Sequence, residues 1–199
     1  MWIHSILFNG NKAPLLRLQR IGVVFISFQA YCYFGVIKLG KKGKEIVEVD
    51  IGELVKELNT AYAEEWIAVY YYKWAATVMS GVNSPPVADL LNKIAGDEEE
   101  HAKELADRII ELGGEPEKDF ENLYKIARCR KIVFPKDTGD MKGFLKAVAE
   151  QGEACAIEGY TKLLKSLSPC YGKDVRTFHL IEHILSEEVQ HEEAFENLL

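Results

Sequence analysis

A pattern of acidic, aromatic and imidazole residues occurs twice along the chain and constrains its fold more than any other feature. In each copy a glutamate precedes a tyrosine by 7 positions, and a Glu-x-x-His tetrapeptide follows after a gap of nearly the same length. The two copies consist of Glu65, Tyr72, Glu98 and His101, then of Glu153, Tyr160, Glu188 and His191. Residues three apart lie on one face of a helix, so each tetrapeptide can offer a carboxylate and an imidazole to the same ligand.

Capping and helix-breaking residues predict four long helices after Asp50. Asp50 and Glu53 have the form of a capping box, and Ser84, followed by two prolines, is typical of another helix cap. Asp174 can cap the last helix, while glycine and proline residues supply the stops. The expected helices cover residues 51–80, 85–112, 140–167 and 175–199. No run of alternating residues after Asp50 supports a strand, so the fold class is all-α.

The segment between the second and third helices, residues 115–138, is long enough to carry the chain back along a bundle. Prolines bound it at Pro116 and Pro135. Apolar residues at helical spacing within it predict a short connecting helix, and they are Phe120, Leu123, Tyr124 and Ile126. The order of helix pair, long crossover and helix pair indicates a four-helix bundle.

The expected helices place four glutamates at matching heights in the bundle. Glu65 precedes the glycine that ends its helix by nearly as many positions as Glu98 follows the serine that begins the next one. Glu153 and Glu188 are likewise almost equally far along the chain from the two ends of the loop that joins their helices. Since a helix rises about 1.5 Å per residue, the members of each pair differ in height by only a few ångström. Four carboxylates therefore meet near the middle of the bundle.

Such a cluster in an apolar interior predicts a metal site. Buried carboxylates without neutralising cations would cost too much free energy to be retained. Mixed carboxylate and imidazole ligands suit iron or manganese better than calcium, which prefers oxygen alone, or a structural zinc site with thiolate ligands. The candidate metal and catalytic residues are Glu65, Glu98, His101, Glu153, Glu188 and His191. The hydroxyls of Tyr72 and Tyr160 are expected to bind ligand carboxylates from the core.

Charge and cysteine usage exclude several other classes. The net charge of −7 comes mostly from the part after Asp50, so the chain has no basic face there for a phosphate backbone, and no nucleic-acid partner is expected. The cysteines lie far apart with no Cys-x-x-Cys pair, which argues against a zinc ribbon, a rubredoxin-type site or a thioredoxin motif; they are Cys32, Cys129, Cys155 and Cys170.

Residues 1–49 form an apolar N-terminal extension before the helical domain at 50–199. Within it, residues 21–37 carry few polar groups and are flanked by Arg20 and several lysines. This stretch is slightly short for a membrane span of about 20 residues, and it lacks a signal-peptide cleavage pattern. It is either an anchor or, as we favour, an incidental or poorly ordered tail, for which a misplaced start codon is one explanation. We expect a cytoplasmic protein without a membrane partner.

From about Asp50 to Leu199 the sequence resembles the ferritin superfamily, and within it the Dps-like proteins with a paired-cysteine motif, sometimes called thioferritins. The motifs that carry the resemblance are Glu65 to Tyr72, Glu98 to His101 followed by IIELGGEP, the cysteine in ARCRKIVFP, EACAIEGYT, and GKDVRTF leading to EEVQH. The resemblance implies a ferritin-like four-helix bundle with a di-iron site. It also implies that Cys129 and Cys155 lie beside this site as redox cysteines, either as a thiol pair or as a disulfide.

The resemblance assigns a role to each candidate ligand. Glu65 with His101 would bind one iron ion, Glu153 with His191 would bind the other, and Glu98 and Glu188 would bridge the two. Members of this family assemble as hollow dodecameric shells, oxidise Fe(II) with hydrogen peroxide in preference to O2, and keep the ferric mineral inside. For this chain we therefore expect two iron ions per subunit, with manganese or zinc as substitutes.

Two alternatives to a ferroxidase remain open at this point. The first is a rubrerythrin-like peroxidase or a manganese catalase, which would use similar ligands without storing mineral. The second is a non-catalytic protein whose acidic helices bind a partner. The assembly mass and the metal content separate these alternatives from an iron-storing shell.

Overall fold

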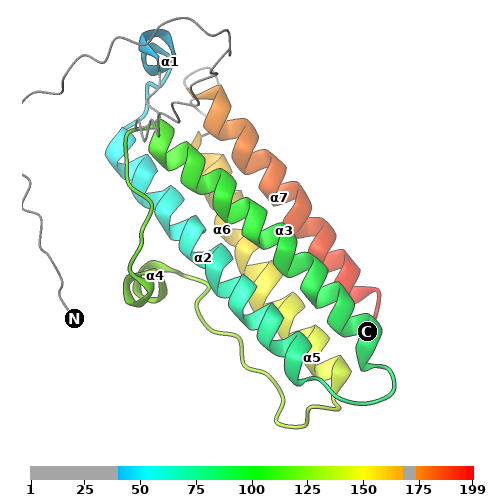
Figure 1. Cartoon of the computed structure of the whole chain (residues 1–199). Coiled ribbons are helices and arrows are strands. Elements are labelled where there is room, and N and C mark those ends of the chain that lie inside the picture. The colour runs from blue at the N-terminus through cyan, green and yellow to red at the C-terminus, as the bar shows by residue number, and fades with distance from the viewer. Residues whose placement is uncertain (1–39, 168–173) are drawn as a thin grey trace, which may run out of the picture. The chain divides into compact units, whose positions relative to one another are not determined.

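The structure of the protein is a computed structural model that describes residues 40–167 and 174–199. Within these ranges the chain forms helices and no strand. After the short α1 (Lys41–Glu45), the long helices α2 (Ile51–Val78) and α3 (Ser84–Glu111) form one antiparallel pair. A crossover that contains α4 (Phe120–Ile126) then leads to the second pair (Figure 1). The predicted all-α four-helix bundle with a short crossover helix is confirmed.

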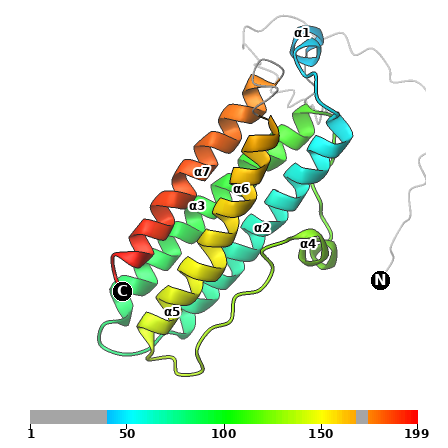
Figure 2. The same ribbon diagram turned by 180° about the vertical axis from the view of Figure 1, so that it is seen from behind.

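The third long helix is continuous but not uniform. It consists of α5 (Met141–Val148), a π-helical segment η1 (Ala149–Glu153) and α6 (Ala154–Leu167). The fourth helix, α7 (Val175–Glu196), runs antiparallel to it (Figure 2). Contacts join α2 to α3, α6 to α7, α2 to α6 and α3 to α7, so the four helices surround a common axis.

The helix starts follow the capping residues, with one exception. Asp50 accepts a hydrogen bond from the backbone N–H of Glu53 at 3.0 Å, as the capping box requires. The prediction that Ser84 caps α3 was wrong, because the N-cap is Asn83 and its side chain makes no capping hydrogen bond. The Ser84 hydroxyl instead donates to the carbonyl of Gly81 at 2.8 Å. Gly81 has a φ of 111°, which suits a residue without Cβ, and the turn that it forms accepts the Ser84 hydroxyl at its carbonyl.

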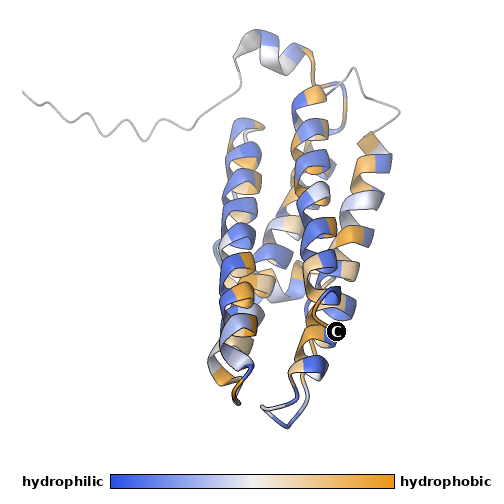
Figure 3. Ribbon diagram, turned by 90° about the vertical axis from the view of Figure 1, so that its right-hand side faces the viewer, coloured by the Kyte–Doolittle hydropathy of each residue, from blue (hydrophilic) through white to orange (hydrophobic). Residues whose placement is uncertain are grey.

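The apolar core has two parts, one toward each end of the bundle. Each long helix carries hydrophilic and hydrophobic residues around its turns (Figure 3). One cluster includes Tyr72, Leu91, Phe144 and Phe195, and the other includes Leu58, Leu105, Leu163 and Ile181. Along α3 the first cluster ends at Ala95 and the second begins with Leu105, and the buried Glu98 and His101 lie between them. The sequence thus leaves a polar layer between two apolar clusters.

A buried ion pair joins α3 to the start of α7. The Arg108 guanidinium lies 2.8 Å and 3.0 Å from the two carboxylate oxygens of Asp174, and its Nε donates to the Thr177 hydroxyl at 2.7 Å. All three residues are at most 2% exposed. Asp174 also caps α7, as the sequence predicts, by accepting from the backbone N–H of Thr177 at 3.1 Å. The pair therefore fixes where α7 begins relative to α3.

The crossover packs on the outer side of α2. Aromatic residues of α2 and α4 surround a hollow of about 210 Å³, lined by Trp66, Ile67, Tyr70, Tyr71, Phe120, Leu123 and Tyr124. Further along α2, Trp74 packs against Phe134 of the crossover, with ring centroids 5.2 Å apart. No helix among the described residues is long and apolar enough to cross a membrane, and the stretch at 21–37 lies outside those residues.

Candidate metal centre

The six residues singled out in the sequence meet in the polar layer between the two apolar clusters. Their ligand atoms fall into two groups, and within each group the atoms lie within 4.8 Å of one another. The first group is Glu65, Glu98, His101 and Glu188, and the second is Glu98, Glu153, Glu188 and His191. Every member is buried. Glu98 and Glu188 belong to both groups, so they stand where two neighbouring cations would share ligands.

Both imidazoles turn the same ring nitrogen toward the carboxylates. The Nδ1 atom of His101 lies 3.1 Å from Glu98 Oε2 and 3.0 Å from Glu188 Oε1. The Nδ1 atom of His191 lies 3.2 Å from Glu98 Oε1. The two rings stack with centroids 5.9 Å apart. Nδ1 is therefore the atom that each histidine offers to the space between the carboxylates.

Two tyrosines support the outer carboxylates, as the sequence predicts. The Tyr72 hydroxyl donates to Glu153 Oε1 at 2.7 Å, and the Tyr160 hydroxyl donates to Glu65 Oε1. Each tyrosine thus binds the glutamate of the opposite copy of the repeat. The other two histidines of α7, His179 and His183, are exposed, with side chains 56% and 52% accessible.

Several buried polar atoms of the cluster make no hydrogen bond of good geometry, although some lie close to another polar atom of the cluster. They include Glu98 Oε1, Glu153 Oε2, Glu188 Oε1 and His191 Nδ1. Buried polar atoms are almost always paired in folded proteins, so an unpaired group of this density needs an explanation. Carboxylate oxygens and imidazole nitrogens facing one small volume are the ligand set of a pair of transition-metal ions. The residues present therefore fit a di-metal site.

Burial and mutual repulsion keep protons on the cluster. Burial raises the pKa of Glu65, and the nearby Glu98 raises it further; burial and Glu188 do the same for the pKa of Glu153. Burial and the charges of Glu98 and Glu65 raise the pKa of Glu188 to about 8. Burial lowers the pKa of His101, but hydrogen bonds to Glu188 and Glu98 outweigh it and bring this pKa to about 12. Without metal, the protons held by these carboxyls and by His101 therefore reduce the negative charge of the cluster, as metal cations would.

We expect the metal-free protein to lose thermal stability as the pH rises from about 5 to about 8.5. A carboxyl whose pKa is raised by folding stabilises the fold below its ordinary pKa, and this contribution is lost as the pH rises through the raised value. For Glu188 that window runs from 4.5 to about 8, and for His101 it runs from 6.5 to about 12. Melting curves in a chelator check the expectation, and Glu188→Gln should flatten the slope. A melting temperature that is constant across this range contradicts it.

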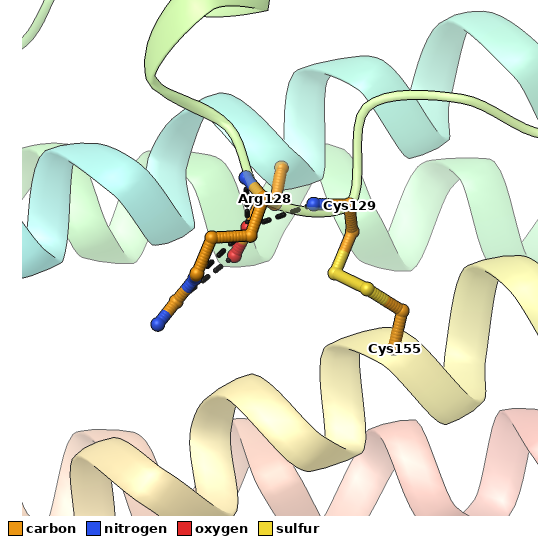
Figure 4. The surroundings of a disulfide bond; sticks show 4 residues. Arg128, Cys129 and Cys155 are labelled. Carbon is orange, nitrogen blue, oxygen red and sulfur yellow. Dashed lines mark hydrogen bonds and ion pairs between the residues drawn. A yellow bond between two sulfur atoms is a disulfide. The ribbon is translucent and has the colours of Figure 1, made fainter.

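The two cysteines that the resemblance places beside the site form a disulfide between the crossover and α6. The Sγ atoms of Cys129 and Cys155 are 2.03 Å apart (Figure 4). The buried carboxylate of Glu64 accepts hydrogen bonds from the backbone N–H groups of Arg128 at 2.6 Å and Cys129 at 3.0 Å. The Arg128 guanidinium also donates to it, at 3.1 and 3.2 Å. Glu64, adjacent to Glu65 in the sequence, therefore holds the disulfide loop beside the cluster.

A small cavity lies between the disulfide and the cluster. Its volume is about 20 Å³, and its lining includes Cys129, Glu65, Glu188 and Gly152. A space of this size holds about one water molecule. A Cβ atom at Gly152 would collide with the Tyr72 hydroxyl, so glycine is needed for this close approach.

Sequence reasoning missed three carboxylates that contact the cluster or its surroundings. Glu64 binds the disulfide loop, and Glu187 Oε2 lies 2.8 Å from His101 Nε2. Asp97 lies 3.5 Å from His191 Nε2. A signal for the last two was present, because an acidic residue directly precedes each Glu-x-x-His tetrapeptide.

Comparison with known proteins agrees with this architecture. The ferritin family profile, described as a ferritin-like domain, matches residues 55–199. A DNA protection during starvation protein from Pyrococcus furiosus is 32% identical over 151 residues, which cover 76% of this chain and 79% of the relative. The solved structure of a dodecameric thioferritin from Bacteroides fragilis, a bacterioferritin-related protein, has a TM-score of 0.72 at 32% identity and covers 79% of this chain and 92% of that one.

A bacterioferritin from Desulfovibrio desulfuricans, whose structure is described for its di-iron site, is similar as well. It has a TM-score of 0.60 at 27% identity, and the match covers 78% of this chain and 81% of the bacterioferritin. The chain therefore belongs to the ferritin-like superfamily, close to the Dps-like DNA protection proteins and to a bacterioferritin-related thioferritin.

Proposed function

We propose that this protein is a ferroxidase that binds two Fe(II) ions per subunit and oxidises them with hydrogen peroxide or O2. The two overlapping ligand groups carry the proposal, because Glu98 and Glu188 are common to both and each group adds one further glutamate and one histidine. The di-iron site named for the Desulfovibrio desulfuricans bacterioferritin supports iron as the metal. In this assignment Glu65 and His101 bind one ion, Glu153 and His191 bind the other, and Glu98 and Glu188 bridge them.

The chemistry uses two one-electron donors for one two-electron oxidant. Two Fe(II) ions, one hydrogen peroxide and two protons give two Fe(III) ions and two water molecules, so no hydroxyl radical is released. Before metal binds, His101, with a pKa of about 12, and Glu188, with a pKa of about 8, both hold protons at neutral pH. Since metal binding displaces these protons, Fe(II) uptake should release them and weaken as the pH falls.

The remaining carboxylates and tyrosines hold the site in place. Tyr72 and Tyr160 donate to one oxygen of Glu153 and of Glu65, and the second oxygen of Glu153 makes no hydrogen bond. The apolar clusters above and below the polar layer exclude bulk water from it. The site therefore binds its substrate ions on preoriented oxygens.

The disulfide adds a redox pair beside the site. Cys129 and Cys155 are half-buried, and the cavity next to Cys129 also touches Glu65 and Glu188. Once a cellular thiol has reduced the disulfide, its two thiols and one hydrogen peroxide give a disulfide and two water molecules. We assign Cys129 and Cys155 this role of consuming peroxide next to the iron site.

A shell of twelve subunits, with the ferric product stored inside, completes the proposal. The dodecameric state of the Bacteroides fragilis thioferritin supports it. Iron titration of the metal-free full-length protein, followed by peroxide addition and by measurement of the intact mass, tests both parts. We expect two Fe(II) per chain, oxidation of about two Fe(II) per peroxide, and a dodecameric mass. Peroxide turnover by a much smaller assembly without mineral would support a rubrerythrin-like peroxidase or manganese catalase instead, and absence of stoichiometric metal would overturn the proposal.

A further inference from the structure

A single buried carboxylate holds the crossover at the point where it carries Cys129. Glu64, on α2, is 7% exposed, and its Oε1 atom accepts hydrogen bonds from the backbone N–H groups of Arg128 and Cys129. The Arg128 guanidinium donates to both oxygens of the same carboxylate, at 3.2 Å and 3.1 Å. One side chain on α2 therefore binds both the backbone and a side chain of the crossover.

The two crossover residues that Glu64 binds also reach α6. The side chain of Cys129 turns toward Cys155, whereas that of Arg128 points away from the disulfide (Figure 4). A Cβ atom at Gly159 would lie 3.3 Å from the Arg128 guanidinium and 3.8 Å from the Glu64 carboxylate. Gly159 is about one helical turn beyond Cys155. The ion pair of Glu64 and Arg128 therefore packs on α6 beside the disulfide.

None of these hydrogen bonds uses a sulfur atom, so reduction of the disulfide removes none of their donors or acceptors. Cys129 and Cys155 are 26 positions apart in the sequence. If the crossover were free after reduction, the two thiols would have to meet by closing a loop, at a cost in chain entropy. With the backbone of Cys129 bound to Glu64, that cost is met by the fold before the sulfur atoms react.

We propose that Glu64 is a positioning residue that keeps Cys129 beside Cys155 when both are reduced, so that the disulfide re-forms readily. The proposal rests on the peroxide role assigned to the pair in the proposed function. In that reaction one thiol and one hydrogen peroxide give a sulfenic acid and a water molecule. The second thiol then attacks the sulfenic sulfur, the S–O bond breaks as the S–S bond forms, and a second water molecule leaves.

The position of the second thiol decides what becomes of the sulfenic acid. A sulfenic acid with a thiol beside it condenses to a disulfide, whereas one without a thiol partner reacts with another peroxide and becomes a sulfinic acid. Cellular thiols reduce the disulfide but not the sulfinic acid. By holding the two cysteines together, Glu64 therefore keeps the pair in a reversible cycle.

Equilibration of the full-length protein in glutathione buffers tests the proposal. Alkylation and peptide mass spectrometry give the fraction of protein in which Cys129 and Cys155 are bonded, and hence the equilibrium constant for closing the disulfide. Glu64→Ala should lower this constant by about 10- to 100-fold, the factor that a hydrogen bond to a charged group typically contributes. The reduction potential of the pair should rise by about 30 mV for each tenfold loss.

The conservative variant Glu64→Gln keeps an oxygen that can accept from both backbone N–H groups of the crossover. It should therefore restore most of the equilibrium constant, although its amide does not pair with the guanidinium as a carboxylate does. Should Glu64→Ala fail to fold, Glu64→Leu fills the same volume without an acceptor and should show the same loss.

Glu57→Ala is the matched control. Glu57 lies two helical turns before Glu64 on α2, and its Oε2 atom is 3.5 Å from the Arg128 guanidinium. The side chain of Glu57 is 45% exposed. Its replacement removes a carboxylate near Arg128 and leaves the hydrogen bonds from Glu64 to the crossover backbone in place. The equilibrium constant should therefore equal that of the unmodified protein.

Peroxide treatment of the reduced, iron-free protein gives a second readout. The unmodified protein should form the disulfide, whereas Glu64→Ala should accumulate sulfinic acid at one of the two cysteines. Peptide mass spectrometry distinguishes the two products. If Glu64 served only the stability of the bundle, a folded Glu64→Ala variant would give the same products as the unmodified protein.

The outcomes separate this proposal from the proposed function. An equilibrium constant in Glu64→Ala equal to that of the unmodified protein overturns the positioning role, and so does an equal loss in Glu57→Ala. If peroxide does not close the disulfide in the unmodified protein, the peroxide role of the pair fails. The glutathione titration then decides by itself whether Glu64 positions Cys129.

Discussion

Replacing Glu98 by alanine is expected to lower the rate of Fe(II) oxidation by more than about 100-fold. Losing a partner behind a ligand typically costs about 10- to 100-fold, and Glu98 belongs to both ligand groups, so its loss affects both ions. The bundle should remain folded, because the variant removes one buried carboxylate from a crowded acidic cluster. Stopped-flow absorbance of the ferric product after peroxide addition measures the rate.

Glu99→Ala is the matched control for this variant. Glu99 is the next residue along α3, but its side chain is 54% exposed and pairs with the Lys73 ammonium at 3.3 Å. Its replacement should leave the oxidation rate unchanged. Undiminished oxidation by Glu98→Ala, with the helical content of the unmodified protein, would show that the chemistry occurs elsewhere.

Replacing Arg108 by alanine should destabilise the fold by about 3–5 kcal/mol, the cost of leaving a buried charge without its partner. Asp174 is 2% exposed, and the Arg108 guanidinium supplies both of the charged hydrogen bonds to its carboxylate. The free energy of unfolding from denaturant titration of the metal-free protein measures the effect. The double variant Arg108→Ala with Asp174→Asn should recover part of the loss, because it removes the unpaired charge.

Arg176 provides the comparison for Arg108. It pairs with Glu111, which also contacts Arg108, but its side chain is 62% exposed. Exposed pairs contribute at most about 1 kcal/mol, so Arg176→Ala should have little effect. If both arginine variants lost the same free energy of unfolding, burial would not be the reason for the contribution of the Arg108 pair.

The six clustered residues could be predicted because helix geometry alone determines where they lie. The number of residues between each glutamate and the end of its helix, together with the rise per residue, places Glu65, Glu98, Glu153 and Glu188 at one height in the bundle. In the structure their ligand atoms lie together. The helix bounds followed from capping residues such as Asp50, whose hydrogen bonds are local. Both arguments depend only on neighbours in the sequence.

The contacts that were missed depend on neighbours in space. Glu64 and Glu187 are single acidic residues among many, and only the packing of the crossover or of α7 gives them the partners Cys129 and His101. The failed cap at Ser84 has the same kind of cause, because the turn at Gly81 takes up the serine hydroxyl. The π-helical segment was missed because nothing in its residues, AEQGE, distinguishes it from a regular helix.

That wide helical turn explains how one helix can face the core along its whole length. Val148 and Tyr160 lie on either side of the π-helical segment, and both are buried, at 0% and 3% exposure. In a regular helix, at about 100° per residue, they would point roughly 120° apart, whereas a turn that absorbs one extra residue reduces the difference to about 20°. Glu153 closes this turn. The third helix thus contains one residue more than a regular helix would need to bury both Val148 and Tyr160. The extra residue lies in the π-helical turn that ends at Glu153, whose carboxylate is buried.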